Sequence, residues 1–441
     1  MKKLSIILIC FMLLFTFCNQ RNKTEFVRVK GDHFILENKS YNYLGTNLWY
    51  GPLLGMATEP GNRTRLKREL DSLKSIGLTN LRIMAASEGT IYDNTVRPAF
   101  QPELGKYNED VLIGLDYLLA ELNKRDLKAV LYLGNNWVWS GGFAQYVAWV
   151  NNDTMPNPFL PEYDWNDFMN YSARFYSNQE AVEAYNKYVK MLVNRKNTIT
   201  GQLYKDDPAI MSWQLANEPR PGRGDEGQDN FDAFSSWVEN TVKMIKSMDS
   251  NHLVSTGNEG LAGSMQSKEL YKRIHQFNNI DYMTVHLWVL NWGWFDPQKS
   301  EQTFPDAREK AKNYIQKHIK YAKDLNKPLV LSEFGIPRDN HSYSPESSTN
   351  FRDEYYAMIF EMIYENARNG DPLVGSNFWA WGGGWKPAGA KKYIWEPGDP
   401  FCGDPPQEPQ GRNSVFISDQ STIRILREYT DKMTKLNIKA K

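Results

Sequence analysis

The sequence predicts one α/β domain built as a (β/α)8 TIM barrel, with long tryptophan-rich loops at the C-terminal ends of its strands. The first observation is a short β-branched apolar run followed by an amphipathic helical stretch, a pattern that recurs eight times. The second is that residues 46–51, after the first run, lack the glycine-rich turn that is usual in doubly wound sheets. The third is that no proline-, glycine- or serine-rich linker divides the chain.

The first four strand and helix pairs occupy the N-terminal half of the chain. In the first helix, Leu66, Leu70 and Leu73 recur at three- and four-residue steps, as one buried helix face requires. Gly77 follows as a C-cap. A long insertion rich in aromatic residues and proline separates the third strand from its helix. The predicted pairs are strand 42–48 with helix 63–76, strand 80–84 with helix 111–123, strand 129–133 with helix 180–196, and strand 210–215 with helix 231–248.

The second half of the chain repeats the pattern four more times. Segments 210–219 and 328–335 run apolar, as strands buried on both faces do, and each then delivers one glutamate, Glu218 or Glu333. Eight such pairs fit a barrel with inserted loops. The remaining pairs are strand 253–256 with helix 268–277, strand 282–286 with helix 306–325, strand 329–332 with helix 350–369, and strand 374–379 with helix 421–435.

The N-terminus has the form of a secretory signal, because Met1-Lys2-Lys3 precedes an apolar run at 4–17 that is too short to span a bilayer with margin. Cys18 follows directly and resembles the lipid-attachment cysteine of bacterial lipoproteins. We expect a lipoprotein-type signal peptide at 1–17, a tether at 18–26 and one domain at 27–441. The alternative is an ordinary cleaved signal with an incidental cysteine. We therefore expect export, to the periplasm, outer membrane or cell surface if Cys18 carries a lipid and to the medium otherwise.

Composition excludes several classes of function. The formal net charge of +0 and the pI of about 7.0 give no basic surface for nucleic acid, and a neutral ligand is compatible with them. After signal removal only Cys18 and Cys402 remain, so no disulfide framework is expected. The H-E-x-x-H, C-x-x-C, P-loop and G-x-S-x-G motifs are absent and the six histidines are scattered. We expect a monomer with no metal and no cofactor, which contacts a membrane only through a lipid at Cys18.

Tryptophans gather on the loops that follow the predicted strands, and of the 14 only Trp213 and Trp237 lie elsewhere. Flat indole rings on one face suit stacking against the apolar faces of sugar rings. For any single tryptophan a loop packed on itself explains the position equally well, so the distribution of the set carries the inference. The loop tryptophans are Trp49, Trp137, Trp139, Trp149, Trp165, Trp288, Trp292, Trp294, Trp379, Trp381, Trp385 and Trp395.

Polar groups collect at the same strand ends, where the chemistry of a barrel is located. Two carboxylates presented there, Glu218 and Glu333, suggest acid and nucleophile chemistry on one substrate. A single strand arginine or histidine is more often structural, but a whole set at one barrel mouth favours a site. The set is Arg82, Asn135, Asn136, Asn217, Glu218, Glu259, His286 and Glu333.

At these residues the chain resembles the retaining glycoside hydrolases of family 5, in the clan of (β/α)8 glycosidases. The resemblance is carried by segments 215–219 and 331–335 together with Arg82, His286 and Trp379. Segments 256–260, 398–411 and 413–416 are similar to tracts of the endo-1,4-β-mannanase subgroup. One departure is Trp288, at a position where the family often has a tyrosine that contacts the nucleophile. An indole N–H can also donate to a carboxylate.

The resemblance implies roles for individual residues. Glu333 would be the nucleophile, kept ionised by Arg82, and Glu218 the acid that later acts as base on water. Retention requires the two carboxyl groups to lie roughly 5 Å apart. Asn217 would bond the sugar 2-OH, and Trp379 would be the stacking floor beside the scissile bond. The expected substrate contacts are Arg82, Asn135, Asn217, Glu259, His286, Trp288, Trp379 and Trp137.

Three hypotheses follow. The first is an endo-acting β-mannanase on mannan, glucomannan or galactomannan. The second keeps the chemistry but changes the specificity, to an exo-acting β-mannosidase or a β-1,4-glucanase; here endo or exo action depends on whether the loop at 134–178 leaves the cleft open or blocks one end. The third is a lipoprotein that binds glycans without cleaving them, although a binding protein needs neither glutamate.

Overall fold

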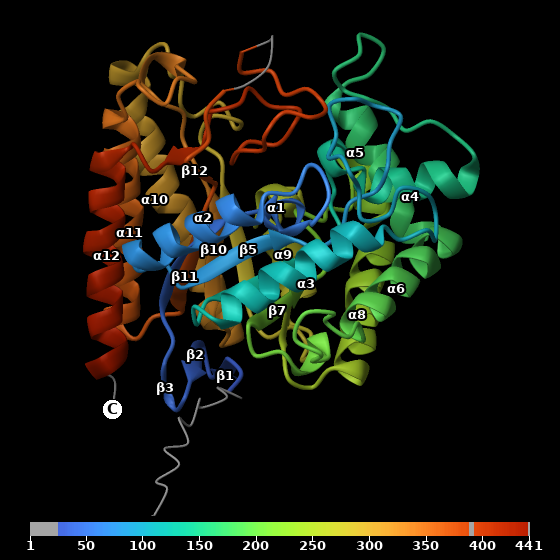
Figure 1. Cartoon of the computed structure of the whole chain (residues 1–441), viewed down its shortest axis with the longest axis horizontal. Helices are drawn as coiled ribbons and strands as arrows, with labels where there is room; N and C mark the ends of the chain where they lie inside the picture. The colour runs from blue at the N-terminus through green and yellow to red at the C-terminus, as the bar shows by residue number, and fades with distance from the viewer. Residues whose placement is uncertain (1–24, 388–391, 440–441) are drawn as a thin grey trace, which may run out of the picture.

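The computed structural model describes residues 25–387 and 392–439. The predicted signal peptide at 1–17 lies outside the described residues, as do Cys18 and most of the predicted tether at 18–26. Within the described ranges the chain forms the predicted barrel of strands surrounded by helices (Figure 1). No helix in these ranges is both long and apolar enough to cross a bilayer.

The barrel consists of eight parallel strands in the spatial order β8-β7-β6-β5-β4-β11-β10-β9. The last join, between β8 and β9, is made by single bonds: the Asp281 N–H donates to the Val254 carbonyl at 2.8 Å and the His286 N–H to the Glu259 carbonyl at 3.1 Å. The barrel is therefore nearly closed, and each strand lies within two residues of its predicted bounds. The strands are β4 (Tyr43–Asn47), β5 (Asn80–Met84), β6 (Lys128–Tyr132), β7 (Ile210–Gln214), β8 (Leu253–Ser255), β9 (Met283–Leu287), β10 (Leu329–Phe334) and β11 (Leu373–Phe378).

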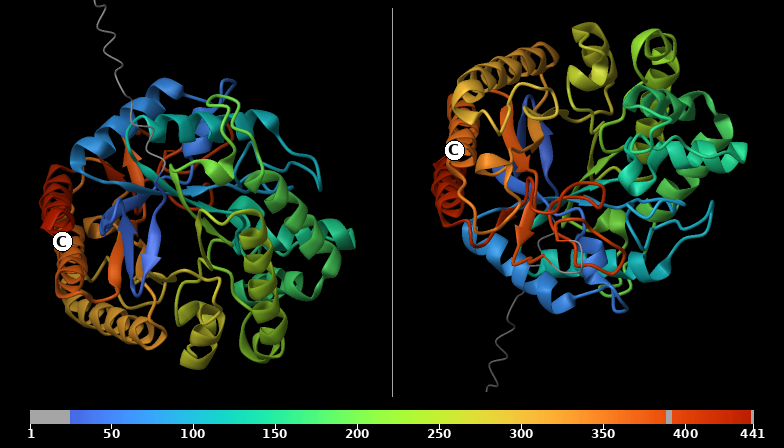
Figure 2. Two further views of the ribbon diagram at one scale, coloured as in Figure 1. Left: turned by 90° about the horizontal axis from the view of Figure 1, so that it is seen from below. Right: turned by 90° about the horizontal axis from the view of Figure 1, so that it is seen from above.

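The predicted helices form a ring around these strands, as both views in Figure 2 show. Gly77 ends α2 in the left-handed region, at a φ of 92°, which confirms it as a C-cap. Helix α10 begins at Ser300, before the predicted start, because Pro305 lies inside the helix instead of marking its first turn. The ring consists of α2 (Arg63–Ile76), α3 (Glu109–Asn123), α6 (Gln179–Val193), α8 (Phe231–Met248), α9 (Lys268–His275), α10 (Ser300–Leu325), α11 (Asn350–Asn369) and α12 (Gln420–Lys439).

The loops at the C-terminal strand ends carry structure of their own, which the sequence did not predict. The insertion after β6 folds into two α-helices, and the loop after β11 is closed by a short pair of parallel strands. The α-helices and strands of these loops are α1 (Gly51–Gly55), α4 (Gly142–Asn151), α5 (Trp165–Ala173), α7 (Gly224–Asp229), β12 (Trp381–Gly383) and β13 (Val415–Phe416). The short 3-10 helices are η1 (Val138–Ser140), η2 (Arg174–Ser177), η3 (Tyr204–Asp206), η4 (Ala262–Ser264) and η5 (Asp339–His341).

A small antiparallel sheet covers the opposite, N-terminal end of the barrel. Its strands are β1 (Arg28–Lys30), β2 (His33–Leu36) and β3 (Lys39–Ser40), and they lie below the barrel in Figure 1. Phe34 is fully buried and belongs to one apolar cluster with Val130, Met211 and Val330 from three barrel strands. The strands are too short for a periodicity signal, which is why the sequence did not predict them. This floor leaves the loop end as the accessible end of the barrel.

Candidate active site

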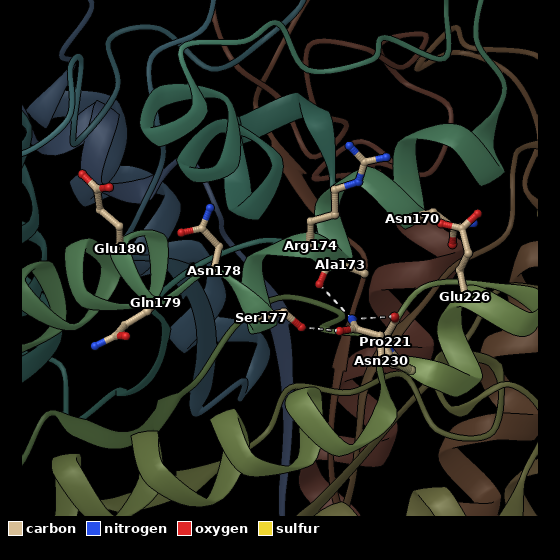
Figure 3. Close-up of a pocket in the computed structure, with 10 residues that line it drawn as sticks. All are labelled: Asn170, Ala173, Arg174, Ser177, Asn178, Gln179, Glu180, Pro221, Glu226 and Asn230. Carbon is tan, nitrogen blue, oxygen red and sulfur yellow. Dashed lines mark hydrogen bonds between the residues drawn. The ribbon is translucent and has the colours of Figure 1, made fainter.

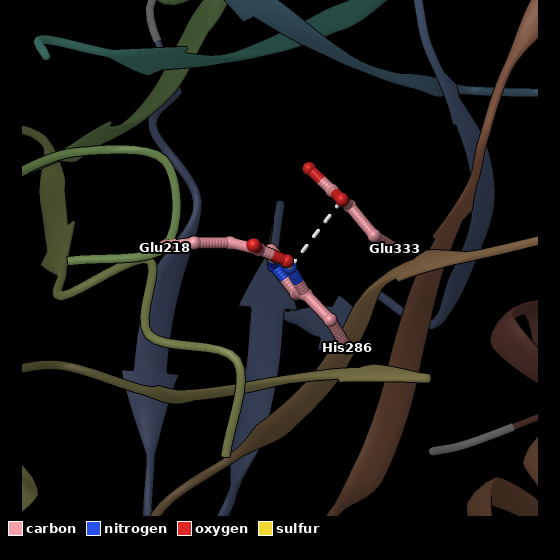
Figure 4. Close-up of side chains that lie close together, drawn as sticks. All are labelled: Glu218, His286 and Glu333. Carbon is pink, nitrogen blue, oxygen red and sulfur yellow. Dashed lines mark hydrogen bonds and ion pairs between the residues drawn. The ribbon is translucent and has the colours of Figure 1, made fainter. Parts of the chain in front are cut away.

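Glu218 and Glu333 meet at the loop end of the barrel, as the sequence predicted. One ligand atom of each carboxylate and one of the His286 ring all lie within 4.8 Å of one another, and the three side chains point toward a common centre (Figure 4). Both glutamates are buried, with exposed fractions of 5% for Glu218 and 3% for Glu333. The separation fits the roughly 5 Å that a retaining glycosidase requires between its two carboxyl groups.

The backbone places Glu218 with an unusual conformation. Glu218 follows β7 and has a φ of 53°, in the left-handed region that few residues other than glycine adopt. Two backbone bonds hold this turn, since the Asn217 N–H donates to the Gly134 carbonyl at 2.8 Å and the Glu218 N–H to the Gly257 carbonyl at 3.0 Å. Strained backbone of this kind clusters at functional sites, because the surrounding structure must over-determine it.

Arg82 holds Glu333 in place. The guanidinium is fully buried, and its Nη1 donates to the Glu333 carboxylate. Its other donors reach Gln214 Oε1 at 2.7 Å, Asn217 Oδ1 at 2.7 Å and Asn47 Oδ1 at 3.1 Å. The planar fork is thus fixed on all sides, and it ties Glu333 to the Asn217 amide beside Glu218.

The charge of Glu333 depends on effects of opposite sign. Burial raises the pKa of the Glu333 carboxyl well above its usual range, while the Arg82 charge lowers it and the Glu218 charge raises it further. The Arg82 charge thus acts toward the ionised form of Glu333, as expected, while burial acts against it. Since Arg82 contacts Glu333 and not Glu218, it favours Glu333 as the member of the pair that carries the negative charge.

Glu218 contacts two side-chain nitrogen atoms. Trp137 Nε1 donates to Oε2 at 2.5 Å, and His286 Nδ1 lies 2.6 Å from Oε1. Burial lowers the pKa of His286 well below its usual value, and the nearby Arg82 charge adds to the effect, so the ring is neutral. A neutral imidazole nitrogen can either donate to a carboxylate or accept from a carboxylic acid, so this contact is compatible with a group that gives up a proton and takes it back.

Glu259 is paired with an arginine that sequence reasoning missed. Arg220, two residues after Glu218, donates to the Glu259 carboxylate, and its guanidinium lies 4.5 Å from the centre of the Trp137 ring. Burial raises the pKa of Glu259 to about 8; Arg220 opposes the rise and Glu218 adds to it. Arg220 Nη2 also lies 3.7 Å from Glu218 Oε2. The only sequence signal for Arg220 was its place in the loop that carries Glu218.

The predicted site residues form two shells around one cavity of about 1320 Å³. Asn135 belongs to the buried shell, where its Oδ1 accepts from Asn217 Nδ2 and from the Trp137 N–H, both at 3.1 Å. Asn136, also buried, accepts from Ser172. Those that line the cavity are Trp137, Asn217, Glu218, Glu259, Trp288, Glu333 and Trp379. Those buried behind it are Arg82, Asn135, Asn136 and His286.

The loop tryptophans divide into two groups. Trp288 packs edge-on against Trp379, with ring centres 6.1 Å apart. Within the described part of the chain no hydrogen bond joins Trp288 to Glu333, so its indole N–H does not replace the family tyrosine in this structure. The tryptophans that line the cavity are Trp137, Trp139, Trp165, Trp288, Trp292, Trp294 and Trp379. The others are packed in the loops, namely Trp49, Trp149, Trp381, Trp385 and Trp395.

The loop between β12 and β13 covers one side of the barrel mouth. It is anchored over β4 and α2, where Trp49 Nε1 donates to the Gly403 carbonyl at 2.9 Å and Arg65 Nη1 to the Phe401 carbonyl at 2.7 Å. From this loop Glu408 and Arg412 line the cavity, and sequence reasoning had not singled them out as site residues. Loops after the first and second barrel strands contribute nothing to the lining within the described residues.

A second cavity lies on the outside of the barrel, between α5, α6 and α7 (Figure 3). Its Asn230 side chain donates to the Ala173 carbonyl at 2.8 Å and to the Pro221 carbonyl at 3.0 Å, and Ser177 Oγ donates to Asn230 at 2.9 Å. None of the predicted site residues lines it. These bonds tie the insertion after β6 to the loop that carries Glu218, so the cavity marks a structural junction.

Comparison with known proteins agrees with this geometry. A sequence model of the family described as "GH family 5 beta-mannosidase-like" matches residues 24–438. The chain is 32% identical to mannan endo-1,4-beta-mannosidase 7 of Arabidopsis thaliana over 366 residues, which cover 80% of this chain and 77% of that protein.

Solved structures give the same picture. A glycoside hydrolase family 5 mannosidase from Rhizomucor miehei superposes with a TM-score of 0.85 at 36% identity, covering 94% of this chain and 99% of that one. A hyperthermostable endo-1,4-beta-D-mannanase from Thermotoga petrophila superposes with a TM-score of 0.64 at 26% identity, covering 89% of this chain and 99% of that one.

Proposed function

Because the chain belongs to glycoside hydrolase family 5, among its mannosidase-like members, we propose that it hydrolyses β-1,4-mannosidic bonds in mannan, glucomannan or galactomannan with retention of configuration. One observation carries the proposal: a carboxylate oxygen of Glu218 and one of Glu333 lie within 4.8 Å across the barrel mouth. The names of relatives with mannan as substrate support the choice of sugar.

The proposed reaction is a double displacement. In the first step a Glu333 oxygen attacks the anomeric carbon while the bond to the glycosidic oxygen breaks, and Glu218 gives its proton to that oxygen. In the second step Glu218 takes a proton from water, and the water oxygen displaces Glu333 from the anomeric carbon. The free sugar is then released, and both carboxyl groups have returned to their starting protonation states.

The remaining residues orient these two groups. Asn217 lies between Arg82 and Asn135, with both polar atoms of its amide bonded, so its position beside the anomeric sugar is fixed for contact with a 2-OH. Trp379 is almost fully buried, with 4% of its surface exposed, yet it lines the cavity and so offers a flat floor for the sugar that is attacked. Fixed donors of this kind need no reorganisation during the reaction.

Internal cleavage of the polymer is the first candidate mode of action, because it is the mode in the name of the Arabidopsis relative. The second candidate mode is the removal of mannose from chain ends, and a specific observation favours it. The β12–β13 loop is bonded to Trp49 and Arg65 on the side of the mouth above β4, and among the described residues the loops after β4 and β5 contribute nothing to the cavity lining. The higher TM-score to a mannosidase than to an endo-mannanase points the same way. A cleft closed at one end accepts a chain terminus and excludes a chain that must extend in both directions.

Digestion of mannohexaose tests both the chemistry and the mode. Release of mannose alone indicates action at chain ends, whereas a mixture of shorter oligosaccharides indicates internal cleavage. A panel of mannan, galactomannan, glucomannan and cellulose separates a mannanase from a β-1,4-glucanase. If the purified protein releases no reducing sugar from any of them, the proposed function is wrong, and binding of mannan without cleavage would then indicate a glycan-binding protein.

For localisation we propose export and lipid attachment at Cys18, which rests on the sequence alone. The protein from cells expressing the full chain should then partition into detergent-rich phase, and Cys18→Ser should move it to the aqueous phase. The same substitution should leave the specific activity toward mannan unchanged, because Cys18 lies ahead of the barrel. Equal partitioning of the two forms would favour an ordinary cleaved signal.

A further inference from the structure

The insertion after β6 carries an aromatic surface that the proposed chemistry does not use. Phe159 and Trp165 line the rim of the active-site cavity, and they expose 49% and 40% of their surface. A single exposed apolar side chain needs no explanation, but two neighbouring exposed rings beside a cavity mark a ligand contact more often than an isolated ring does.

The two rings continue a line of aromatic contacts that starts at Glu218. Trp137 donates to Glu218 and packs against Trp165, with ring centres 5.5 Å apart and planes at 84°. Trp165 in turn packs against Phe159, at 5.5 Å and 82°. Phe168 lies beneath, stacked on Trp137 at 6.4 Å and edge-on to Trp165 at 6.2 Å. A continuous aromatic path therefore runs from the acid group to the rim.

Hydrogen bonds hold the backbone that carries the exposed rings. Trp165 is the first residue of α5, and Asp164 caps that helix by accepting from the Asn166 N–H at 2.7 Å and the Asp167 N–H at 2.9 Å. Asn157 is buried and accepts from the Phe159 N–H at 3.1 Å. A platform fixed before the ligand arrives loses little conformational entropy on binding.

The path lies on the side of the leaving group. Glu218 donates to the glycosidic oxygen, so the sugar that leaves is on the far side of that oxygen from the sugar attacked by Glu333. The β12–β13 loop covers the opposite side of the mouth, above β4. The rim near Trp165 belongs to the open side, and it lies one aromatic ring further from Glu218 than Trp137 does.

We propose that Trp165 and Phe159 form a platform for a mannose unit of the leaving chain, beyond the unit bonded to the cleaved oxygen, and thereby set a preference for longer substrates. The proposal rests on the proposed function. The face of each ring offers the apolar, electron-rich surface that the C–H groups of a mannose ring require. Arg223 and Gln228, which also line the cavity, provide polar partners on the same open side.

The test compares a long substrate with a short one. We expect Trp165→Ala and Phe159→Ala each to lower the ratio of kcat/KM for mannohexaose to kcat/KM for 4-nitrophenyl β-mannoside by about five- to tenfold. Tyr163→Ala is the matched control, because Tyr163 lies on the same insertion and is 42% exposed but does not line the cavity. That variant should leave the ratio within a factor of about two.

Two outcomes would overturn the platform. One is an unchanged ratio in both variants, and the other is an equal loss on the long and the short substrate, which would indicate a general disturbance of the insertion. Trp165→Phe is the conservative control for misfolding of Trp165→Ala. It keeps a smaller flat ring, so its ratio of kcat/KM values should lie between those of the wild type and Trp165→Ala. If the wild-type protein cleaves neither substrate, the proposed function fails instead, and the two failures are distinguishable.

Discussion

Trp137 donates its indole N–H to Glu218 at 2.5 Å while its ring face supports the Arg220 guanidinium at 4.5 Å. One side chain therefore orients the acid group and carries the cation that is bonded to Glu259. Trp137→Phe should keep the ring and remove the donor. We expect kcat to fall by up to about tenfold, the upper range for the loss of one hydrogen bond, with KM for mannotriose changing less than kcat. Trp149→Phe, at a loop tryptophan away from the cavity, should leave both unchanged.

The two carboxyl groups should differ when azide is supplied to their alanine variants. Glu333→Ala and Glu218→Ala should each lower turnover by several orders of magnitude with the fold intact. In Glu333→Ala azide enters from the side of the missing nucleophile and should yield an α-mannosyl azide. In Glu218→Ala azide attacks the glycosyl-enzyme and should yield the β-product from an activated substrate. NMR of the products checks the assignment, and exchanged stereochemistry would reverse the two roles.

The pH profile of kcat/KM should show the environment of Glu333. Its carboxylate must be ionised to attack, so kcat/KM falls as the pH drops below its pKa. Because burial raises that pKa well above its usual value, we expect the acid limb at a higher pH than an exposed glutamate would give. Arg82→Met removes the charge that opposes the rise, so its acid limb should lie higher still. Arg82→Lys keeps the charge and should shift it less.

Matched controls exist for that profile. Arg68→Met changes an arginine whose side chain is 63% exposed, and its profile should coincide with that of the wild type. Near-ultraviolet circular dichroism shows whether the Arg82 variants keep their packing. An acid limb of Arg82→Met at or below the wild-type position would contradict the account of Glu333.

The contribution of Glu259 to the free energy of unfolding should decrease as the pH rises from 4.5 to about 8. Burial is the main cause that raises the pKa of Glu259 from 4.5 to about 8 in the folded state, and the charge of Arg220 opposes this rise. Between these values the folded protein binds a proton that the unfolded chain has released, so folding is favoured at the lower pH and the advantage is lost toward pH 8. Glu259→Gln should flatten the dependence of Tm on pH. Glu226→Gln, at an exposed position, should preserve the wild-type slope.

The anchor of the β12–β13 loop should control the product pattern. Glu69 is buried and accepts from Trp381 Nε1 at 2.9 Å and from the Gly384 N–H at 3.1 Å. Glu69→Ala leaves these donors without a partner, and we expect a loss of ~2–4 kcal/mol in the free energy of unfolding. A loosened loop uncovers the side above β4, so the fraction of oligosaccharides among the products of mannohexaose should rise. An unchanged product pattern at lower Tm would show that the loop does not close the cleft.

The barrel and its two glutamates could be predicted because each strand signal is local. Residues 80–84 and 210–214 are short segments rich in apolar residues that can be recognised within five positions, and the parallel order then brings their ends together. Glu218 and Glu333 follow from that order alone.

Residues whose role depends on a distant partner could not be predicted in the same way. Arg220 is defined by Glu259 and Trp137, 39 and 83 positions away in the chain, and nothing near it in sequence shows those partners. Glu408 lies in a loop whose course is set by bonds to Trp49 and Arg65. The β1–β3 sheet could not be predicted because its strands have only two to four residues each.

The position of the β1–β3 sheet bears on how an attached molecule would be oriented. The sheet of β1 to β3 closes the barrel at the end opposite the cavity, so a covalent attachment ahead of Arg28 pulls on the closed end. Under the lipid attachment proposed at Cys18, the cavity lies at the end of the barrel opposite the attached one. Long polymers that cannot enter a narrow gap against a membrane could then still reach Trp165 and Glu218, with no hinge needed to present them.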